Sequence, residues 1–277
     1  MRRPLARTTV RDALDSAVIA LTAAGCDTPR LDAEVLLAAA MGVGRAAVVA
    51  GPGTGIEPDA ARRFQDFARR RREREPVAYI LGRQGFRHIE LAVDPRVLIP
   101  RPETEHVVEA VLELPDGARV CDVGTGSGAI ALALKHERPD LRVVATDVSA
   151  DAIAVAAANA ARLGLEIELV HGDLLAAVRG PLDAVVANPP YVEDGARLAP
   201  EIVRYEPALA LRAGPDGLDV VRRLVPDIGA SGAPVAALEV GAGQAAAVAD
   251  LLRGVGYAHV EAPRDLAGID RVVVARR

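Results

Sequence analysis

From residue 118 onward, short apolar runs alternate with segments of helical period, and no other feature constrains the fold as strongly. The apolar runs are 118–123, 142–146, 166–170, 182–187 and 234–240, and the helical segments are 129–136, 151–163, 218–228 and 244–255. Strands that alternate with helices pair in parallel and are covered on both faces. The sequence therefore predicts an α/β fold with a Rossmann-like, mostly parallel sheet, closed by strands at 257–262 and 271–275.

The part of the chain before this alternation has a different pattern, and 277 residues leave room for two domains. Helical periods at 9–24, 30–41 and 59–75 surround a loop at 51–55, whose glycines and proline cannot continue a helix. These segments predict an N-terminal helical bundle.

Residues 85–99 alternate loosely around Asp94-Pro95, which predicts a bridging strand pair with its turn at that dipeptide, and a helix is expected at 103–114. The expected domains are 1–84, a β-hairpin linker at 85–100, and 101–277.

Charge also divides the chain into two parts. Residues 1–88 hold 15 basic and 10 acidic residues, whereas 89–277 hold 18 and 28, so we expect the first module to dock a partner. The run of arginines in its third helix has two open interpretations: a surface for RNA or an acidic protein, or a solvated face, since acidic residues are interleaved with the run. The arginines are Arg62, Arg63, Arg69 to Arg72 and Arg74, and the acidic residues are Asp66, Glu73 and Glu75.

Cysteine and apolar content indicate the compartment. Cys26 and Cys121 are far apart and lack a C-x-x-C spacing, and the histidines are dispersed, so we expect neither a disulfide nor a metal site. The apolar stretch at 18–24 is too short to cross a membrane. A cytoplasmic protein without a membrane partner is expected.

A glycine-rich loop, Gly124-Thr125-Gly126-Ser127-Gly128, directly follows the strand at 118–123 and opens a helix. Glycines there allow a tight turn and close approach of a ligand, while the helix start offers unpaired N–H groups. Its G-x-G-x-G spacing differs from the dinucleotide pattern, and a tight strand-to-helix turn alone could explain it. Nevertheless, the loop predicts a nucleotide-like ligand.

Acidic residues at the ends of the next two strands support this prediction. Asp147 could accept both hydroxyls of a ribose, or could simply cap a helix beside Ser149. Asp173, followed by Leu174, would lie near an adenine amino group.

The segment Asn188-Pro189-Pro190-Tyr191 follows the strand at 182–187 and carries the predicted chemistry. The Asn188 side chain and the Pro189 carbonyl are two acceptors on a backbone stiffened by two rings, and together they could hold both hydrogens of a planar NH2 group. Tyr191 could pack on the flat face of that group. A turn leaving a strand is the alternative, but the preceding loop and Asp147 favour the site.

These residues resemble the class I S-adenosylmethionine-dependent methyltransferases that methylate amides and exocyclic base amines. Further segments are similar to the PrmC/HemK protein-glutamine methyltransferases, and the similarity extends from about residue 10 to the C-terminus. Those segments are 75–82, 98–105, 205–209, 217–218, 238–241 with Gln244, and 265–268 with Arg271.

The resemblance implies transfer of methyl from S-adenosyl-L-methionine to the glutamine amide nitrogen in the Gly-Gly-Gln motif of release factors 1 and 2, with S-adenosyl-L-homocysteine as product. It implies that Gly124 to Gly128 hold the methionine part, Asp147 the ribose, and Asp173 with Leu174 the adenine. Relatives often carry an aromatic residue after that Asp, so adenine stacking is not expected here. The loop at 100–104 is expected to border the same pocket.

In this interpretation Asn188, Pro189 and Tyr191 are the catalytic residues, with Asn188 also beside the cofactor, and Pro190 helps to shape the glutamine slot. The alternative is a nucleic-acid exocyclic-amine methyltransferase of the adenine N6 type. The acidic second module and an aromatic content of 3% count against holding a flipped base. We expect a monomer with no nucleic-acid substrate.

Overall fold

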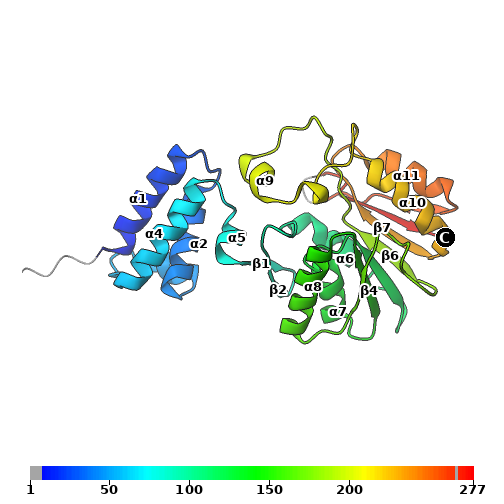
Figure 1. Cartoon of the computed structure of the whole chain (residues 1–277), viewed down its shortest axis with the longest axis horizontal. Helices are drawn as coiled ribbons and strands as arrows, with labels where there is room; N and C mark the ends of the chain where they lie inside the picture. The colour runs from blue at the N-terminus through cyan, green and yellow to red at the C-terminus, as the bar shows by residue number, and fades with distance from the viewer. Residues whose placement is uncertain (1–7, 266–267) are drawn as a thin grey trace, which may run out of the picture. The chain divides into compact units, whose positions relative to one another are not determined.

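The computed structural model describes residues 8–265 and 268–277, so Leu266 and Ala267 of the 265–268 motif lie outside the described residues. The chain divides into two units (Figure 1). Unit 1 comprises Met1–Gly82 and Ala199–Tyr205, and unit 2 comprises Arg83–Leu198 and Glu206–Arg277. Among the described residues, no helix is both long and apolar enough to cross a membrane.

Unit 2 is built on a seven-stranded sheet with the order β5-β4-β3-β6-β7-β9-β8. The strands are β3 (Arg119–Val123), β4 (Arg142–Asp147), β5 (Glu168–His171), β6 (Ala184–Ala187), β7 (Val235–Glu239), β8 (His259–Glu261) and β9 (Val272–Arg276). Strands β3 to β7 pair in parallel, and β9 runs antiparallel to both β7 and β8. The predicted mostly parallel α/β sheet is confirmed.

Helices cover both faces of this sheet. Helices α6 (Glu105–Glu109), α7 (Ala129–Glu137) and α8 (Ala150–Leu163) lie on one face, and α10 (Asp219–Ser231) and α11 (Ala245–Gly254) lie on the other (Figure 1). The central strands are accordingly mostly apolar, and all four residues of β6 are fully buried.

The helix expected at 103–114 is too long. A 3-10 turn, η1 (Pro102–Thr104), precedes α6, which ends at Glu109. Beyond it, the amides of Val111, Leu112 and Leu114 bond to carbonyls three residues back, so the chain tightens out of α-helical geometry.

The predicted strand pair exists, but its turn was placed wrongly. Strands β1 (Arg83–Phe86) and β2 (Ile89–Ala92) pair antiparallel, and Arg87, with a φ of 47°, lies in the two-residue turn. Such short hairpin loops require positive φ, which Asp94-Pro95 cannot supply, because proline has a fixed negative φ. Asp94 instead accepts the Arg96 amide in a separate turn after β2.

Unit 1 is the expected helical bundle, formed by α1 (Val10–Ala23), α2 (Pro29–Met41), α3 (Arg45–Ala50), α4 (Pro58–Arg72), α5 (Val77–Leu81) and α9 (Pro200–Tyr205). Thr9 and Asp12 form a capping box at the start of α1. Leu14, Leu36 and Phe64 lie in its core. The short helices α3, α5 and α9 were not predicted, since six residues or fewer show little periodicity.

The arginines at the end of α4 form neither a uniform binding surface nor a uniformly solvated face. Arg71 is buried and donates to Asp32 at 2.7 Å and to Glu201 at 3.3 Å, and Arg74 also pairs with Glu201. By contrast, Arg69 is exposed and pairs with acids on its own helix. The end of the run therefore holds α9 in unit 1.

Candidate active site

The predicted site residues converge because the ends of three parallel strands lie at one sheet edge. In the register, Val123 pairs with Ala187, and Ala187 pairs with Leu238. One residue further on, Asn188 therefore lies between Gly124 and Glu239. Open α/β sheets bind ligands at this edge.

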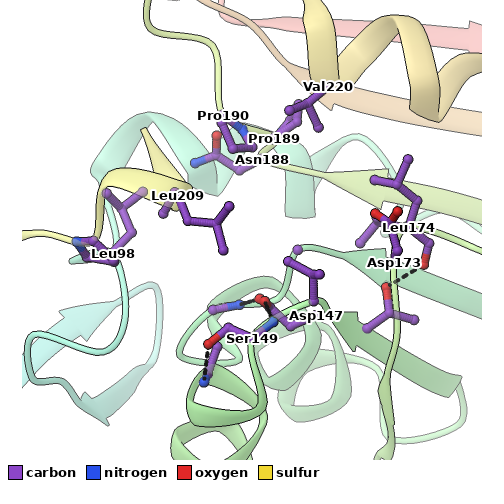
Figure 2. Close-up of a pocket in the computed structure, with 18 of the residues that line it drawn as sticks. Leu98, Asp147, Ser149, Asp173, Leu174, Asn188, Pro189, Pro190, Leu209 and Val220 are labelled. Atoms are coloured by element: carbon purple, nitrogen blue, oxygen red, sulfur yellow. Dashed lines mark hydrogen bonds between the residues drawn. The ribbon is translucent and has the colours of Figure 1, made fainter. Parts of the chain in front are cut away.

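A cavity of about 290 Å³ opens there, close to the lower end of the ~300–1,000 Å³ range of small-molecule pockets. Figure 2 shows Asn188, Pro189 and Pro190 on one side and Asp147 with Ser149 on the other. The predicted residues among its lining are Gly124, Gly126, Asp147, Asp173, Leu174, Asn188, Pro189 and Pro190. Thr125, Ser127, Gly128 and Tyr191 are not among them, and their ligand roles stay predictions.

The glycine loop has the conformation that such a site needs. Gly124 and Gly126 have φ of 74° and 55°, and neither has an atom within 4 Å of the position that a Cβ would take. The loop therefore adopts a backbone that favours glycine and borders open space. Thr125 and Ser127 are buried, and their hydrogen bonds hold the loop in place. The Thr125 hydroxyl donates to Asp122 at 2.7 Å, and the Ser127 backbone carbonyl accepts from the Asn159 amide.

Asp147 is held by two backbone amides, one in the glycine loop and one at the N-cap of α8. Its Oδ2 accepts the Gly126 amide and its Oδ1 accepts the Ser149 amide, each at 2.9 Å. Each carboxylate oxygen has a further lone pair, so Asp147 can still accept ligand hydroxyls. The Ser149 side chain caps α8 by accepting the Ala152 amide.

Asp173 and Leu174 line the cavity from the end of β5. Asp173 is exposed and forms an ion pair with Arg223 of α10. Leu174 has a φ of 49°, and its carbonyl accepts the Thr146 hydroxyl at 3.0 Å, which holds the side chain beside the cavity. An adenine contact by Asp173 would have to compete with Arg223.

Asn188 is oriented by a residue from a distant segment. Its Nδ2 donates to the Thr104 hydroxyl at 3.0 Å, so its Oδ1 remains available as an acceptor. The segment that lines the cavity is 96–98 rather than the expected 100–104, and Thr104 acts instead through Asn188.

Tyr191 does not line the cavity, and its side chain is hydrogen-bonded to the last residue of β7. Its hydroxyl donates to Glu239 at 3.3 Å, and burial together with Glu239 raises the pKa of Tyr191 to about 12. The Gln244 amide donates to the Tyr191 carbonyl at 3.1 Å. A Cβ on Gly217 would lie 2.2 Å from the same carbonyl, so only glycine fits there.

Two acidic residues that the sequence analysis left without a role support the site. Asp122 is fully buried, and burial raises its pKa to about 7 although Thr125 and the Ala131 amide donate to it. Glu206 is also buried, accepts the Ile99 amide at 3.2 Å and pairs with Arg101. Glu206 thus joins the 98–105 and 205–209 segments. The sequence analysis singled out both segments for their similarity to the family, but their spacing in the sequence does not predict that they are in contact.

Asp147, the glycine loop and the Asn188 amide, whose Oδ1 is left as an acceptor, therefore border one cavity. Among the described residues, no three His, Cys, Asp or Glu side chains are placed to hold a metal ion. The arrangement can orient a planar nitrogen group toward a ligand held over β3 and β4.

Comparison with known proteins identifies the fold and the family. A family model described as the PrmC N-terminal domain matches residues 12–82, and a methyltransferase small domain model matches 104–214. The solved structure of the hMettl16 catalytic domain with an RNA hairpin has the same fold, with a TM-score of 0.55 at 18% identity over 82% of this chain and 85% of that one. The fold and site define a class I methyltransferase.

Relatives of known family identify which kind of methyltransferase this chain resembles. The release factor glutamine methyltransferase of Moorella thermoacetica is 47% identical over 281 residues, covering 97% of this chain and 99% of the relative. That of Deinococcus radiodurans is 42% identical over 275 residues, covering 97% and 98%. The chain belongs to the release factor glutamine methyltransferase family.

Proposed function

We propose that this protein transfers the methyl group of S-adenosyl-L-methionine to the side-chain amide nitrogen of the glutamine in the Gly-Gly-Gln motif of peptide chain release factors. The observation that carries the proposal is the placement of Asn188 and Pro189 on the cavity wall opposite Asp147 (Figure 2). The relatives that match over nearly their full length are release factor glutamine methyltransferases, which supports the release factor as substrate.

The residues present fit the cofactor. Gly124 and Gly126 border open space, Asp147 has lone pairs left for two ribose hydroxyls, and Leu174 offers an apolar contact for the adenine. Asp173 flanks the adenine edge in this arrangement. S-adenosyl-L-methionine supplies a methyl group that its sulfonium already activates, leaving S-adenosyl-L-homocysteine as product.

The task of the chain is then to position a poor nucleophile. An amide nitrogen has a delocalised lone pair, and acceptors for both of its hydrogens favour the orientation in which that lone pair faces the methyl group. Asn188 Oδ1 and the Pro189 carbonyl are those acceptors, and the rings of Pro189 and Pro190 limit their movement. Positioning of this kind can lower a barrier by up to about 7–11 kcal/mol.

The proposal includes a cellular setting. The protein acts as a cytoplasmic monomer on release factors 1 and 2, with neither a nucleic-acid substrate nor a membrane partner. The helical unit 1, with its family match at 12–82, is the element that docks the release factor.

The test is to incubate the purified protein with methyl-labelled S-adenosyl-L-methionine and either a release factor or total RNA, and to map the label by peptide mass. Label is expected on the Gly-Gly-Gln glutamine and not on a release factor whose glutamine is replaced by alanine. Asn188→Ala serves as the enzyme control. Label on RNA alone would overturn the protein substrate and favour the nucleic-acid methyltransferase.

A further inference from the structure

The carboxylate of Glu239 is buried next to the Asn188 to Tyr191 segment and does not line the cavity. Glu239, at the end of β7, is 2% exposed, and Thr104, at the end of η1, is 4% exposed. Tyr191 donates to Glu239 Oε1 at 3.3 Å, whereas Oε2 is buried and has no hydrogen-bond partner of good geometry among the described residues. Burial raises the pKa of Glu239 to about 7, against the hydrogen bonding of Thr104 and Tyr191, which lowers it.

The direction of the hydrogen bonds in this cluster matters for the proposed reaction. An ionised carboxylate can only accept. In that state the Tyr191 hydroxyl donates to Glu239 at 3.3 Å, and the Thr104 hydroxyl, whose hydrogen bonding lowers the pKa of Glu239, is the group available to donate to the unpartnered Oε2. The Thr104 oxygen then presents a lone pair to Asn188, which donates to it through Nδ2 at 3.0 Å. Asn188 Oδ1 is consequently the end of the amide left for a ligand.

A change of donor and acceptor between Glu239 and Thr104 would also reverse the orientation of the Asn188 amide. If Glu239 carried a donor toward Thr104, the Thr104 hydroxyl could donate to Asn188 Oδ1, and the amide would rotate by about half a turn. Its NH2 group would then face the NH2 group of a glutamine substrate, donor against donor. Water cannot relieve this conflict easily, because both Thr104 and Glu239 are buried.

We propose that Glu239 is a positioning residue whose ionised carboxylate, acting through the Thr104 hydroxyl, fixes the Oδ1 of Asn188 as the acceptor for the substrate amide. This inference rests on the proposed function. Glu239 contacts neither the cavity nor the reacting atoms and is not itself a catalytic residue. Through Tyr191 it also steadies the far end of the Asn188 to Tyr191 segment.

The other charged groups near Glu239 are few. Glu103 on η1 raises its pKa and Arg271, just before β9, lowers it, while Arg101 acts on its partner Tyr191. The paired strand β6 is apolar along its length. Glu103 and Arg271 act on the pKa of Glu239 in opposite directions, so burial remains the main cause of the raised pKa, and its ionisation should be visible in a pH profile.

The experiment measures kcat and KM for methylation of a purified release factor from pH 6 to 9 in the wild type, Glu239→Gln, Thr104→Val and Thr104→Ser. The control is Glu261→Gln, an exposed acid on β8. Glu239→Gln keeps the shape but places an NH2 donor in the cluster. We expect it to lower kcat by roughly 10- to 100-fold at pH 8, with little change in the Kd for S-adenosyl-L-homocysteine.

The pH profile separates a positioning role from a merely structural one. Glu239 is ionised above its pKa, so its protonation should lower wild-type kcat about tenfold from pH 8 to pH 6, whereas kcat of Glu239→Gln should change much less over that interval. Thr104→Val should lose activity as Glu239→Gln does, and Thr104→Ser should recover it because the hydroxyl returns.

Equal kcat in Glu239→Gln and the wild type, or the same pH profile in both, would overturn the inference while leaving the proposed function intact. If Glu239→Gln does not fold, the comparison of Thr104→Val with Thr104→Ser decides: equal kcat in these two would overturn the inference. A wild-type protein that forms no methylglutamine would instead refute the proposed function, and with it the inference.

Discussion

Replacing Asp147 by alanine should abolish most of the affinity for S-adenosyl-L-homocysteine. Both oxygens of this carboxylate are fixed, at 2.9 Å, by the amides of Gly126 and Ser149, and each keeps a lone pair for a ribose hydroxyl. A hydrogen bond to a charged group contributes about 1.5–3 kcal/mol, so the loss of two costs about 3–6 kcal/mol. At 1.4 kcal/mol per factor of ten, Kd should rise roughly 10²- to 10⁴-fold.

The measurement is calorimetric titration with S-adenosyl-L-homocysteine, which cannot turn over, beside thermal unfolding with and without it. Asp151→Ala is the matched control, because Asp151 is an exposed acid four residues further along, on α8. The wild type and Asp151→Ala should gain melting temperature with ligand, and Asp147→Ala should gain little. A Kd for Asp147→Ala within about threefold of the wild type would refute the ribose role and the reasoning from these two hydrogen bonds.

Three further changes test other parts of the structure. Asn188→Ala should retain the Kd for S-adenosyl-L-homocysteine but lose most methyl transfer, because only the acceptor is removed; near-normal turnover in a single-turnover assay would contradict its role. Arg71→Ala leaves the buried Asp32 without its cation and should cost about 3–5 kcal/mol in denaturant unfolding, whereas Arg72→Ala, on an exposed residue, should change stability little; equal effects would be inconsistent with a buried ion pair. Burial raises the folded-state pKa of Asp122 to about 7, so the folded state binds the extra proton and this group should lower wild-type stability as pH rises from about 4 to 7; Asp122→Asn should make that slope shallower, while Glu239 still contributes in the same direction, and an unchanged slope in urea titrations would refute the assignment.

Much of the candidate site could be predicted from the sequence because its residues follow strands. Gly124, Asp147 and Asn188 each come directly after an apolar run, and parallel strands bring their carboxyl ends to one edge. Local periodicity was therefore enough to place all three around one cavity. Short elements such as α3 and α9 were missed, because a single helical turn leaves no repeating pattern to detect.

The hydrogen-bond partners of these site residues could not be predicted from the sequence, because they are brought together by tertiary packing. The hydrogen bond from Asn188 to Thr104 joins residues 84 positions apart, and the Tyr191 bond to Glu239 spans 48. Arg71 shares the composition of its exposed neighbours, and only the approach of Asp32 and Glu201 makes it a buried ion-pair partner.

The sequence by itself determined the alternation of strands and long helices along unit 2, the sheet edge at which the site lies and the chemical groups placed there, because burial repeats with the period of each element. Only the tertiary structure decided which partner orients each group and where the hairpin turns. These features depend on a few contacts between segments that are distant in the sequence. The local sequence pattern of a segment does not change with the partner that it contacts, so the pattern cannot predict that partner.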